Sequence, residues 1–267
     1  MRFLANCSLM FTEVPILRRP AAAKAAGFDA IEFWWPFADP VPEDAEVDAF
    51  VAAVADSGVR LVGLNFYAAD LFGPDCGALS VPALSADFRR SVPVAAAIGE
   101  RLGVLGYNAL YGNRVEGVVP QAQDELALQN LAFAAGAVAG QGATVLIEAV
   151  SGPKPYPLRT ADQAVRVVDQ ARSAGAANVG FLYDLFHLVS NGDDPDAALA
   201  AHGGKVAHVQ IADSPGRGEP GSGGLDFEHF YTALRTAGYD GWVGLEYRPT
   251  TTTEDSLGWL RERRRGA

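Results

Sequence analysis

The chain has 267 residues, of which 49% are hydrophobic and 20% charged, and its formal net charge at pH 7 is −11. This length suits one large α/β domain or two small ones, and the apolar fraction is that of an ordinary globular protein. The negative charge argues against nucleic acid as the main partner, because a protein that binds a phosphate backbone needs a face rich in lysine and arginine.

Short apolar or β-branched runs alternate with longer alanine-rich runs along the chain. This alternation is typical of repeated βα units. Several predicted strands follow a glycine suited to end a helix, as in AAGFDA, DSGVR, AGQGAT and TAGYDG. The predicted strands are, in chain order, residues 2–8, 29–35, 60–66, 104–110, 143–149, 178–184, 205–211 and 241–247.

Eight strands of this kind, in a chain of about 250 residues, predict an α/β fold, a (β/α)8 barrel. No stretch has the composition of a linker between domains, so residues 1–267 are predicted to form a single domain. A doubly wound open sheet is the alternative, but the chain lacks a strand–GxGxxG–helix unit near its start.

The two ends of the chain and its two cysteines indicate no targeting segment, disulfide or zinc site. MRFLANCSLMF has no long apolar stretch and no obvious cleavage site, so no signal peptide or membrane span is expected. Cys7 and Cys76 form no disulfide framework and no zinc pattern, which suits a reducing cytoplasm. The arginines at 261 and 263–265 are expected on the solvated end of a last helix, where cations suit the helix dipole.

Every predicted strand ends with a polar side chain. In a barrel of this kind the active site lies at the C-terminal ends of the strands, so these side chains are the candidates for chemistry. Taken singly, each could equally be a hydrogen-bonded cap of a loop. They are Asn6 and Ser8, Glu32, Asn65, Asn108, Glu148, Asp184, Gln210 and Glu246.

The last four strands each place an oxygen donor at the end of an apolar run. Glu148, Asp184, Gln210 and Glu246 are separated by 36, 26 and 36 residues, about the length of a βα unit, so they should converge at one mouth of the barrel. Three carboxylates close together repel one another unless a cation lies among them. Three carboxylates and an amide oxygen, without cysteine, favour Mn²⁺ or Mg²⁺ over structural zinc.

Two further groups follow these strands. His187 comes three residues after Asp184, and Arg217 lies in the loop after Gln210. Beside a metal, we interpret the histidine as functional and the arginine as a binder of anions. The other three histidines are interpreted as structural; they are His202, His208 and His229.

The loop in HVQIADSPGRGEPGSGG is rich in glycine, but it is not predicted to bind phosphate, because no Lys-Ser/Thr pair follows the glycines. The glycines are expected to let the loop fold close to a substrate. Glu219 is expected to orient Arg217.

The chain resembles the hydroxypyruvate isomerase family of the xylose-isomerase-like barrels. The resemblance covers nearly the whole chain and is carried by FLANCSLMF, GFDAIEFWWPF, LIEAVS, YDLFHLV, HVQIADSPGRGEPGSG and GWVGLEYRPTTTTEDSLGWL. The ketose 3-epimerases belong to the same superfamily, but many of them carry histidine where this chain has Gln210.

The resemblance implies that Glu148, Asp184, Gln210 and Glu246 hold the divalent metal, Mn²⁺ or Mg²⁺. It also implies that Glu148 and Glu246 are the acid/base pair of an isomerase of glyoxylate metabolism, which interconverts hydroxypyruvate and tartronate semialdehyde (2-hydroxy-3-oxopropanoate). On this hypothesis the substrate is a small 2-oxo or hydroxy acid. Its contacts are His187, Arg217, Glu32, Asn65 and Asn108.

The aromatic residues Trp34, Trp35, Phe66 and Tyr67 would either exclude water from the pocket or pack the barrel. The aromatic loop at 33–37 could also form an interface in a homo-oligomer. The chain departs from the family pattern at Ser151, where relatives have asparagine, and at Leu64, where they have histidine. Both changes are expected at the pocket rim, where they would affect the choice of substrate.

Three alternatives remain open from the sequence. A 2-oxo-tetronate isomerase or a ketose 3-epimerase would use the same scaffold. A DNA-repair endonuclease of the same superfamily would need a histidine-rich site and a basic face, which four histidines and a charge of −11 make improbable. A catalytically inactive barrel would not need the complete set of four oxygen donors.

Overall fold

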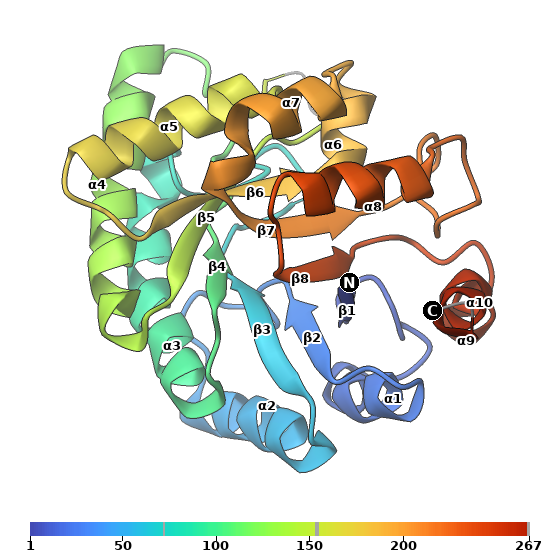
Figure 1. The fold of residues 1–267 in the computed structure, drawn as a ribbon. Coiled ribbons are helices and arrows are strands. Elements are labelled where there is room, and N and C mark those ends of the chain that lie inside the picture. The colour runs from blue at the N-terminus through green and yellow to red at the C-terminus, as the bar shows by residue number, and fades with distance from the viewer. Residues whose placement is uncertain (72, 153–154, 266–267) are drawn as a thin grey trace.

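The strands of the protein close into a parallel ring. The computed structural model of the chain describes residues 1–71, 73–152 and 155–265. Each strand pairs with the next, and β1 pairs with β8, with Arg2 opposite Trp242. Figure 1 shows the helices around the outside of this ring. The predicted (β/α)8 barrel is confirmed, and the open sheet is wrong, since an open sheet would leave two edge strands unpaired.

All eight predicted strands are present, and each is shorter than predicted. The ladder of hydrogen bonds stops where the chain turns into a loop, and β4 keeps only three residues. The strands are β1 (Arg2–Asn6), β2 (Ala30–Phe33), β3 (Arg60–Asn65), β4 (Gly106–Asn108), β5 (Thr144–Glu148), β6 (Val179–Asp184), β7 (Val206–Ile211) and β8 (Trp242–Leu245).

The helices lie between the strands in sequence and outside them in space (Figure 1). They are α1 (Arg19–Ala25), α2 (Asp44–Ser57), α3 (Ser85–Leu102), α4 (Pro120–Val138), α5 (Ala161–Ser173), α6 (Leu185–Ser190), α7 (Pro195–His202), α8 (Phe227–Thr236), α9 (Thr253–Ser256) and α10 (Gly258–Arg265). Short 3-10 turns are η1 (Ile16–Arg18), η2 (Pro82–Leu84), η3 (Ala139–Gln141) and η4 (Gly203–Lys205).

The helix ends follow from the sequence. Gly58 ends α2 with a φ of 71°, a left-handed conformation that glycine adopts without steric cost. Thr160 begins α5 with a capping box, in which its side chain and that of Gln163 each accept a hydrogen bond from the other residue's backbone N–H. Such residues determine where a helix begins or ends, and so where the chain leaves the helix for the next strand or loop.

The strands are buried on both faces. Strand β6 is buried at every position, as expected of a parallel strand with the barrel interior on one face and helices on the other. Phe66 stacks on Tyr107 with ring centroids 5.2 Å apart. This contact packs the loop after β3 onto the strand next to it.

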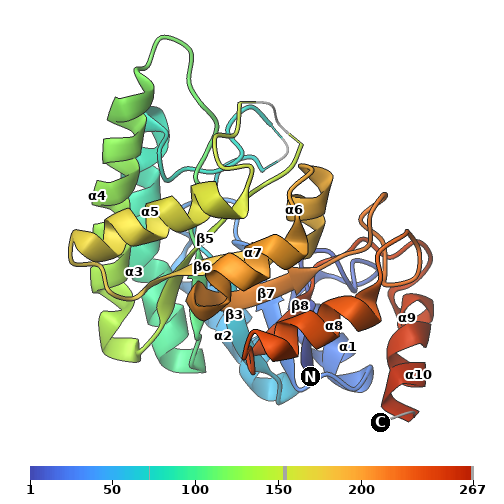
Figure 2. The same ribbon diagram turned by 45° about the horizontal axis from the view of Figure 1, so that its top comes forward.

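The last helix, α10, contacts α8 and the turn after α1 (Figure 2). Arg263 forms an ion pair with Glu228 on α8 and lies 4.3 Å from the ring centroid of Tyr231, while Arg264 donates a hydrogen bond to the carbonyl oxygen of Gly27 (3.1 Å). The predicted solvated basic end is confirmed for Arg261, Arg264 and Arg265, which are exposed, whereas Arg263 is partly buried against α8.

Among the residues that the structure describes, no helix combines the length and the apolar character needed to span a bilayer. Cys7 and Cys76 are buried and free.

Candidate active and metal site

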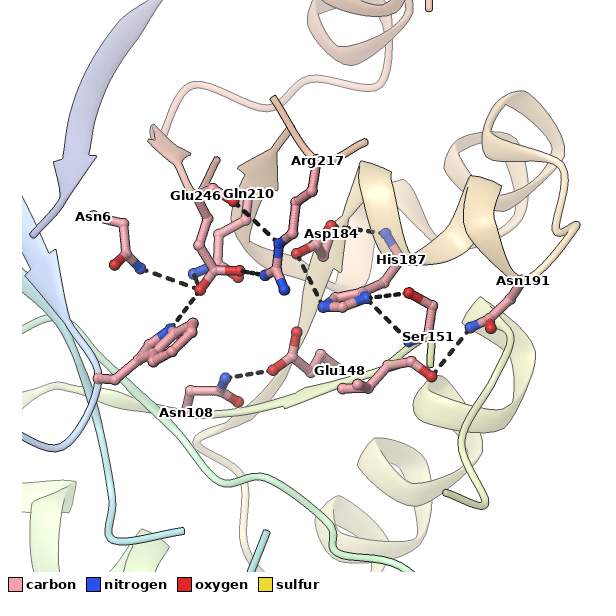
Figure 3. Close-up of polar contacts among 12 residues, drawn as sticks. Asn6, Asn108, Glu148, Ser151, Asp184, His187, Asn191, Gln210, Arg217 and Glu246 are labelled. Atoms are coloured by element: carbon pink, nitrogen blue, oxygen red, sulfur yellow. Dashed lines mark hydrogen bonds and ion pairs between the residues drawn. The ribbon is translucent and has the colours of Figure 1, made fainter. Parts of the chain in front are cut away.

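The four predicted metal ligands lie together at the C-terminal mouth of the barrel (Figure 3). Glu148 and Asp184 end β5 and β6, Gln210 lies near the end of β7, and Glu246 directly follows β8. Asp184 and Gln210 stand opposite each other on paired strands. Each of the four is at most 5% exposed, so they need polar partners within the protein or a bound cation.

A cavity of about 290 Å³ opens at this mouth. Glu148 and Glu246 both line it, as do His187 and Arg217. The volume suits a small ligand, and ionisable groups gathered around such a cavity are typical of an active site.

Two of the predicted metal ligands, Glu148 and Asp184, lie close together. Glu148, Asp184 and His187 each bring one potential ligand atom to within 4.8 Å of the others. Asp184 is held in place by the backbone N–H of His187, which donates to its Oδ1 (3.0 Å). The carboxylate oxygens of Glu148 and Asp184 are therefore close enough to share a metal ion.

The amide of Gln210 is oriented as a metal ligand would be. Its Nε2 donates to Glu32 (2.8 Å) and to Glu246 (3.2 Å), whereas its Oε1 is buried and has no hydrogen-bond partner among the described residues. A buried acceptor without a partner costs roughly 1–3 kcal/mol. A divalent cation would satisfy this oxygen, so the donor set fits a hard metal ion.

Glu246 is bound by protein groups. Its Oε1 accepts hydrogen bonds from Trp34 Nε1 (2.7 Å), Asn6 Nδ2 (3.1 Å) and Gln210, and its Oε2 forms an ion pair with Arg217. Glu246 is not part of the group formed by Glu148, Asp184 and His187. In this structure the positive charge next to its carboxylate is that of Arg217.

Burial raises the pKa values of all three carboxyl groups. The pKa of Glu246 rises from 4.5 to about 7 and that of Asp184 from 3.8 to about 6, in both cases chiefly by burial and despite the opposing charge of Arg217. Burial raises the pKa of Glu148 well above its usual value, and the negative charges of Glu246 and Asp184 add to this. Groups of this kind can exchange protons near neutral pH.

His187 is a neutral hydrogen-bond donor. The backbone N–H of Ser151 donates to its Nδ1 (3.0 Å), so the proton of the neutral ring is on Nε2, which lies 3.8 Å from Asp184 Oδ2. Burial, and then the charge of Arg217, lower the pKa of His187 well below its usual value. At neutral pH its Nε2–H can therefore donate to an oxygen of a ligand.

The loop after β7 is built around Asp213, which the sequence analysis did not single out. Asp213 is fully buried, and its carboxylate accepts hydrogen bonds from four backbone N–H groups of the loop, at 2.8–3.1 Å. Arg217 adopts a φ of 60° and is fixed by backbone hydrogen bonds to Asp213 and Arg248. Glu219 accepts hydrogen bonds from Thr250, so the expectation that it orients Arg217 is wrong.

The predicted substrate contacts lie in different places. Asn65 lines the cavity with His187 and Arg217. Asn108 donates to Glu148 (2.6 Å), and its own side-chain oxygen is buried without a partner among the described residues. Glu32 lies in the barrel interior, where it binds Gln210 and is not among the residues that line the cavity.

The four aromatic residues expected to exclude water or pack the barrel lie in three different environments. Trp34 lines the cavity and contacts Glu246, whereas Trp35 and Tyr67 line a neighbouring cavity of about 320 Å³. Phe66 packs in the core.

The two residues that depart from the family pattern, Ser151 and Leu64, lie in different surroundings. Ser151 lines the cavity and binds His187. Leu64 is buried in the core, so its expected place at the pocket rim is wrong.

Three contacts of the site were missed from the sequence. They are the hydrogen bonds of Trp34 and Asn6 to Glu246, and that of Ser151 to His187. The available indication was that Asn6 ends β1, Trp34 directly follows β2 and Ser151 lies in the loop after β5, since polar groups there face the mouth of the barrel.

A parallel eight-stranded barrel with buried carboxylates around a cavity at its C-terminal mouth is the arrangement of a TIM-barrel enzyme. A family model described as "Xylose isomerase-like TIM barrel" matches residues 20–263. The chain belongs to this family, and within it to the hydroxypyruvate isomerases, as the following relatives show.

A Streptomyces coelicolor protein, provisionally named a hydroxypyruvate isomerase, is 52% identical to this chain over 97% of it and 95% of the relative. A 2-oxo-tetronate isomerase of Cupriavidus necator is 35% identical, covering 97% of each chain. Hydroxypyruvate isomerase of Escherichia coli is 29% identical over 97% of this chain and 98% of the relative.

A solved structure from Brucella melitensis, described as an AP endonuclease of family 2, has a TM-score of 0.87 and is 31% identical, covering 98% of both chains. In the chain described here, His202 and His229 pair with aspartates at the surface and His208 with Glu32. Only His187 reaches the site, so a histidine-rich nuclease centre is not formed by the described residues.

Proposed function

We propose that this protein is an isomerase that interconverts hydroxypyruvate and tartronate semialdehyde. The observation that carries the proposal is that two buried glutamates, Glu148 and Glu246, line the same small cavity with pKa values raised above those of ordinary carboxyl groups. Proton transfer between adjacent carbons needs one group to accept a proton and another to donate one.

The reaction moves hydrogen without net oxidation. One glutamate removes a proton from the carbon that bears the hydroxyl group of hydroxypyruvate, which forms an enediolate. The other glutamate delivers a proton to the former carbonyl carbon, and the hydroxyl proton passes between the two oxygens. His187, as a neutral donor, would hydrogen-bond one of these oxygens, and Trp34 would shield the site from water.

The oxygen donors Glu148, Asp184, Gln210 and Glu246 would hold Mn²⁺ or Mg²⁺. A bound divalent cation supplies positive charge that stabilises an enediolate. The proposal is supported by the unpartnered oxygen of Gln210 and by the closeness of the Glu148 and Asp184 carboxylates, which bring ligand atoms within 4.8 Å of each other.

Arg217 would bind the carboxylate of the substrate. Its guanidinium group lines the cavity, lies 5.3 Å from the ring of Phe186 and is 16% exposed. Arginine pairs with carboxylates in a two-pronged geometry, a contact that a neutral ketose would not offer. This favours an acid substrate, and the 35% identical 2-oxo-tetronate isomerase makes a four-carbon oxo acid the second candidate.

The two free, buried cysteines support a reducing, cytoplasmic setting. A homo-oligomer formed through the loop at 33–37 remains a prediction.

Proton exchange in D₂O tests the substrate. The protein, with Mn²⁺ or Mg²⁺ added, is incubated with hydroxypyruvate, 2-oxo-tetronate and free ketoses, and deuterium at the exchanging carbon is measured by NMR. We expect exchange and product formation with hydroxypyruvate. Faster turnover of 2-oxo-tetronate or of a ketose would reassign the substrate, and no exchange with any of them would overturn the proposal.

Glu246→Gln tests the acid/base role, because it keeps the shape of the side chain but removes the base. We expect kcat to fall by about 10²–10⁴-fold, the usual contribution of a positioned general base. Asp226→Asn, at the start of α8, is the control and should keep wild-type kcat. Wild-type turnover in Glu246→Gln would remove this residue from the mechanism.

A further inference from the structure

The barrel interior holds a fourth buried carboxylate, which the proposed reaction does not use. Glu32 on β2 is 3% exposed, and its Oε2 lies 2.7 Å from Nε2 of His208 on β7. Its Oε1 accepts hydrogen bonds from Asn6 Nδ2 (3.0 Å) and Gln210 Nε2 (2.8 Å). His208 and Gln210 are two positions apart on one strand, so their side chains project to the same face.

Two glycines leave room for this carboxylate. A Cβ atom at Gly244 would lie 2.7 Å from Glu32 Oε1, and one at Gly63 would lie 3.0 Å from Glu32 Cβ and 3.2 Å from its Oε2. Neither glycine has a backbone conformation that excludes other residues. The lack of a side chain at both positions is therefore explained by the space that Glu32 occupies.

Glu32 determines which way the Gln210 amide faces. The Nε2 of Gln210 lies between two carboxylate oxygens, Oε1 of Glu32 and Oε1 of Glu246. If the amide were turned over, its oxygen would face both of these acceptors and the contacts would be repulsive. In the observed orientation the amide oxygen is left without a hydrogen-bond partner among the described residues.

We propose that Glu32 is a positioning residue. It holds the Gln210 amide so that the oxygen, and not the nitrogen, faces the metal. This role rests on the metal site of the proposed function. His208 in turn binds the far oxygen of Glu32. Groups that orient metal ligands in this way typically change metal affinity by about 10–100-fold when they are removed.

Mn²⁺ affinity of the metal-free protein tests the proposal independently of activity. It is measured by titration calorimetry and by the EPR signal of free Mn²⁺. Glu32→Gln replaces the fixed acceptor by an amide that can present either its oxygen or its nitrogen to Gln210. We expect the Kd for Mn²⁺ to rise about 10–100-fold. Asp196→Asn is the matched control, because it removes the carboxylate of a histidine pair at the surface, and its Kd should equal that of the wild type.

A second variant keeps the test decisive if Glu32→Gln does not fold. Gly63→Ala adds a methyl group against Glu32 without changing an ionisable group or a metal ligand, and should raise the Kd in the same direction.

The outcomes separate this proposal from the proposed function. Wild-type affinity in folded Glu32→Gln or Gly63→Ala, with normal Mn²⁺ binding by the wild type, overturns the positioning role alone. If the wild type binds no Mn²⁺, both this role and the metal site of the proposed function are wrong.

Discussion

The carboxylate of Glu246 is held by four side chains that come from the first, second and seventh βα units. Trp34, Asn6 and Gln210 donate to one oxygen and Arg217 binds the other. The sequence places Glu246 and Gln210 at strand ends, and from that their convergence could be predicted. It does not predict which side chains bind each other, because these contacts depend on rotamers and on loop paths. Glu32 shows this: its strand-end position suggested a substrate contact, but its side chain lies within the barrel.

Arg217 is the residue whose role is most directly testable by substitution. Arg217→Ala should raise KM for hydroxypyruvate by about 10–100-fold, because a hydrogen bond to a charged group contributes roughly 1.5–3 kcal/mol. Mn²⁺ should bind no more weakly than to the wild type, since a neighbouring positive charge has been removed. Steady-state kinetics and metal titration measure the two effects.

Arg101→Ala, which removes an arginine paired with Asp48 on the outer helices, is the control and should change neither KM nor metal binding. An unchanged KM in Arg217→Ala would show that this arginine does not anchor the substrate.

At the scale of elements, the periodic pattern predicted each βα unit, and the contacts between units came only from the structure. Tyr107 on β4 is fully buried, and its hydroxyl group donates to Gln141 Oε1 (2.8 Å). A Cβ atom at Gly99 on α3 would lie 1.5 Å from that hydroxyl oxygen. From the sequence, a glycine inside a helix is expected only to weaken that helix. Here the absence of a side chain at Gly99 lets α3 pack closely against Tyr107 of β4.

Gly99→Ala should therefore destabilise the protein, although replacing glycine by alanine in a helix usually stabilises it. We expect a loss of about 1–3 kcal/mol in the free energy of unfolding, as for other overpacked cores. Gly136→Ala on α4 is the matched variant, because no atom outside its own helix lies within 4 Å of the added Cβ. It should stabilise by up to about 1 kcal/mol. Urea denaturation measures both; equal effects would contradict the packing argument.

At the scale of the whole molecule, barrel closure brings three acidic groups from β5, β6 and the residue after β8 into one buried site, and this makes the stability of the protein depend on pH. The pKa values of Asp184 and Glu246 are raised to about 6 and about 7. A carboxyl group with a raised pKa in the folded state binds protons that the unfolded state has released. In the metal-free protein these groups therefore lower stability as the pH rises from about 4 to about 7.

Metal binding should reverse this loss, because the cation needs ionised ligands. We expect the increase in Tm produced by saturating Mn²⁺, relative to EDTA, to be larger at pH 7.5 than at pH 5.5. Thermal unfolding followed by circular dichroism measures it. With Asp184→Asn the increase and its pH dependence should both shrink. An increase that is the same at both pH values would show that these carboxylates do not bind the metal.

The sequence by itself determined the eight βα units, the barrel they form and the four oxygen donors at its mouth. It could do so because side-chain periodicity and strand order are local properties, and because parallel strands bring their C-terminal ends to one side. Only the tertiary structure decided that Arg217 pairs with Glu246, that Asp213 holds the loop, and that Glu32 binds Gln210 from within the barrel. The contacts of Arg217 and Glu32 join residues from different βα units, so their geometry is fixed only when the ring closes, and those of Asp213 depend on the path of a single long loop.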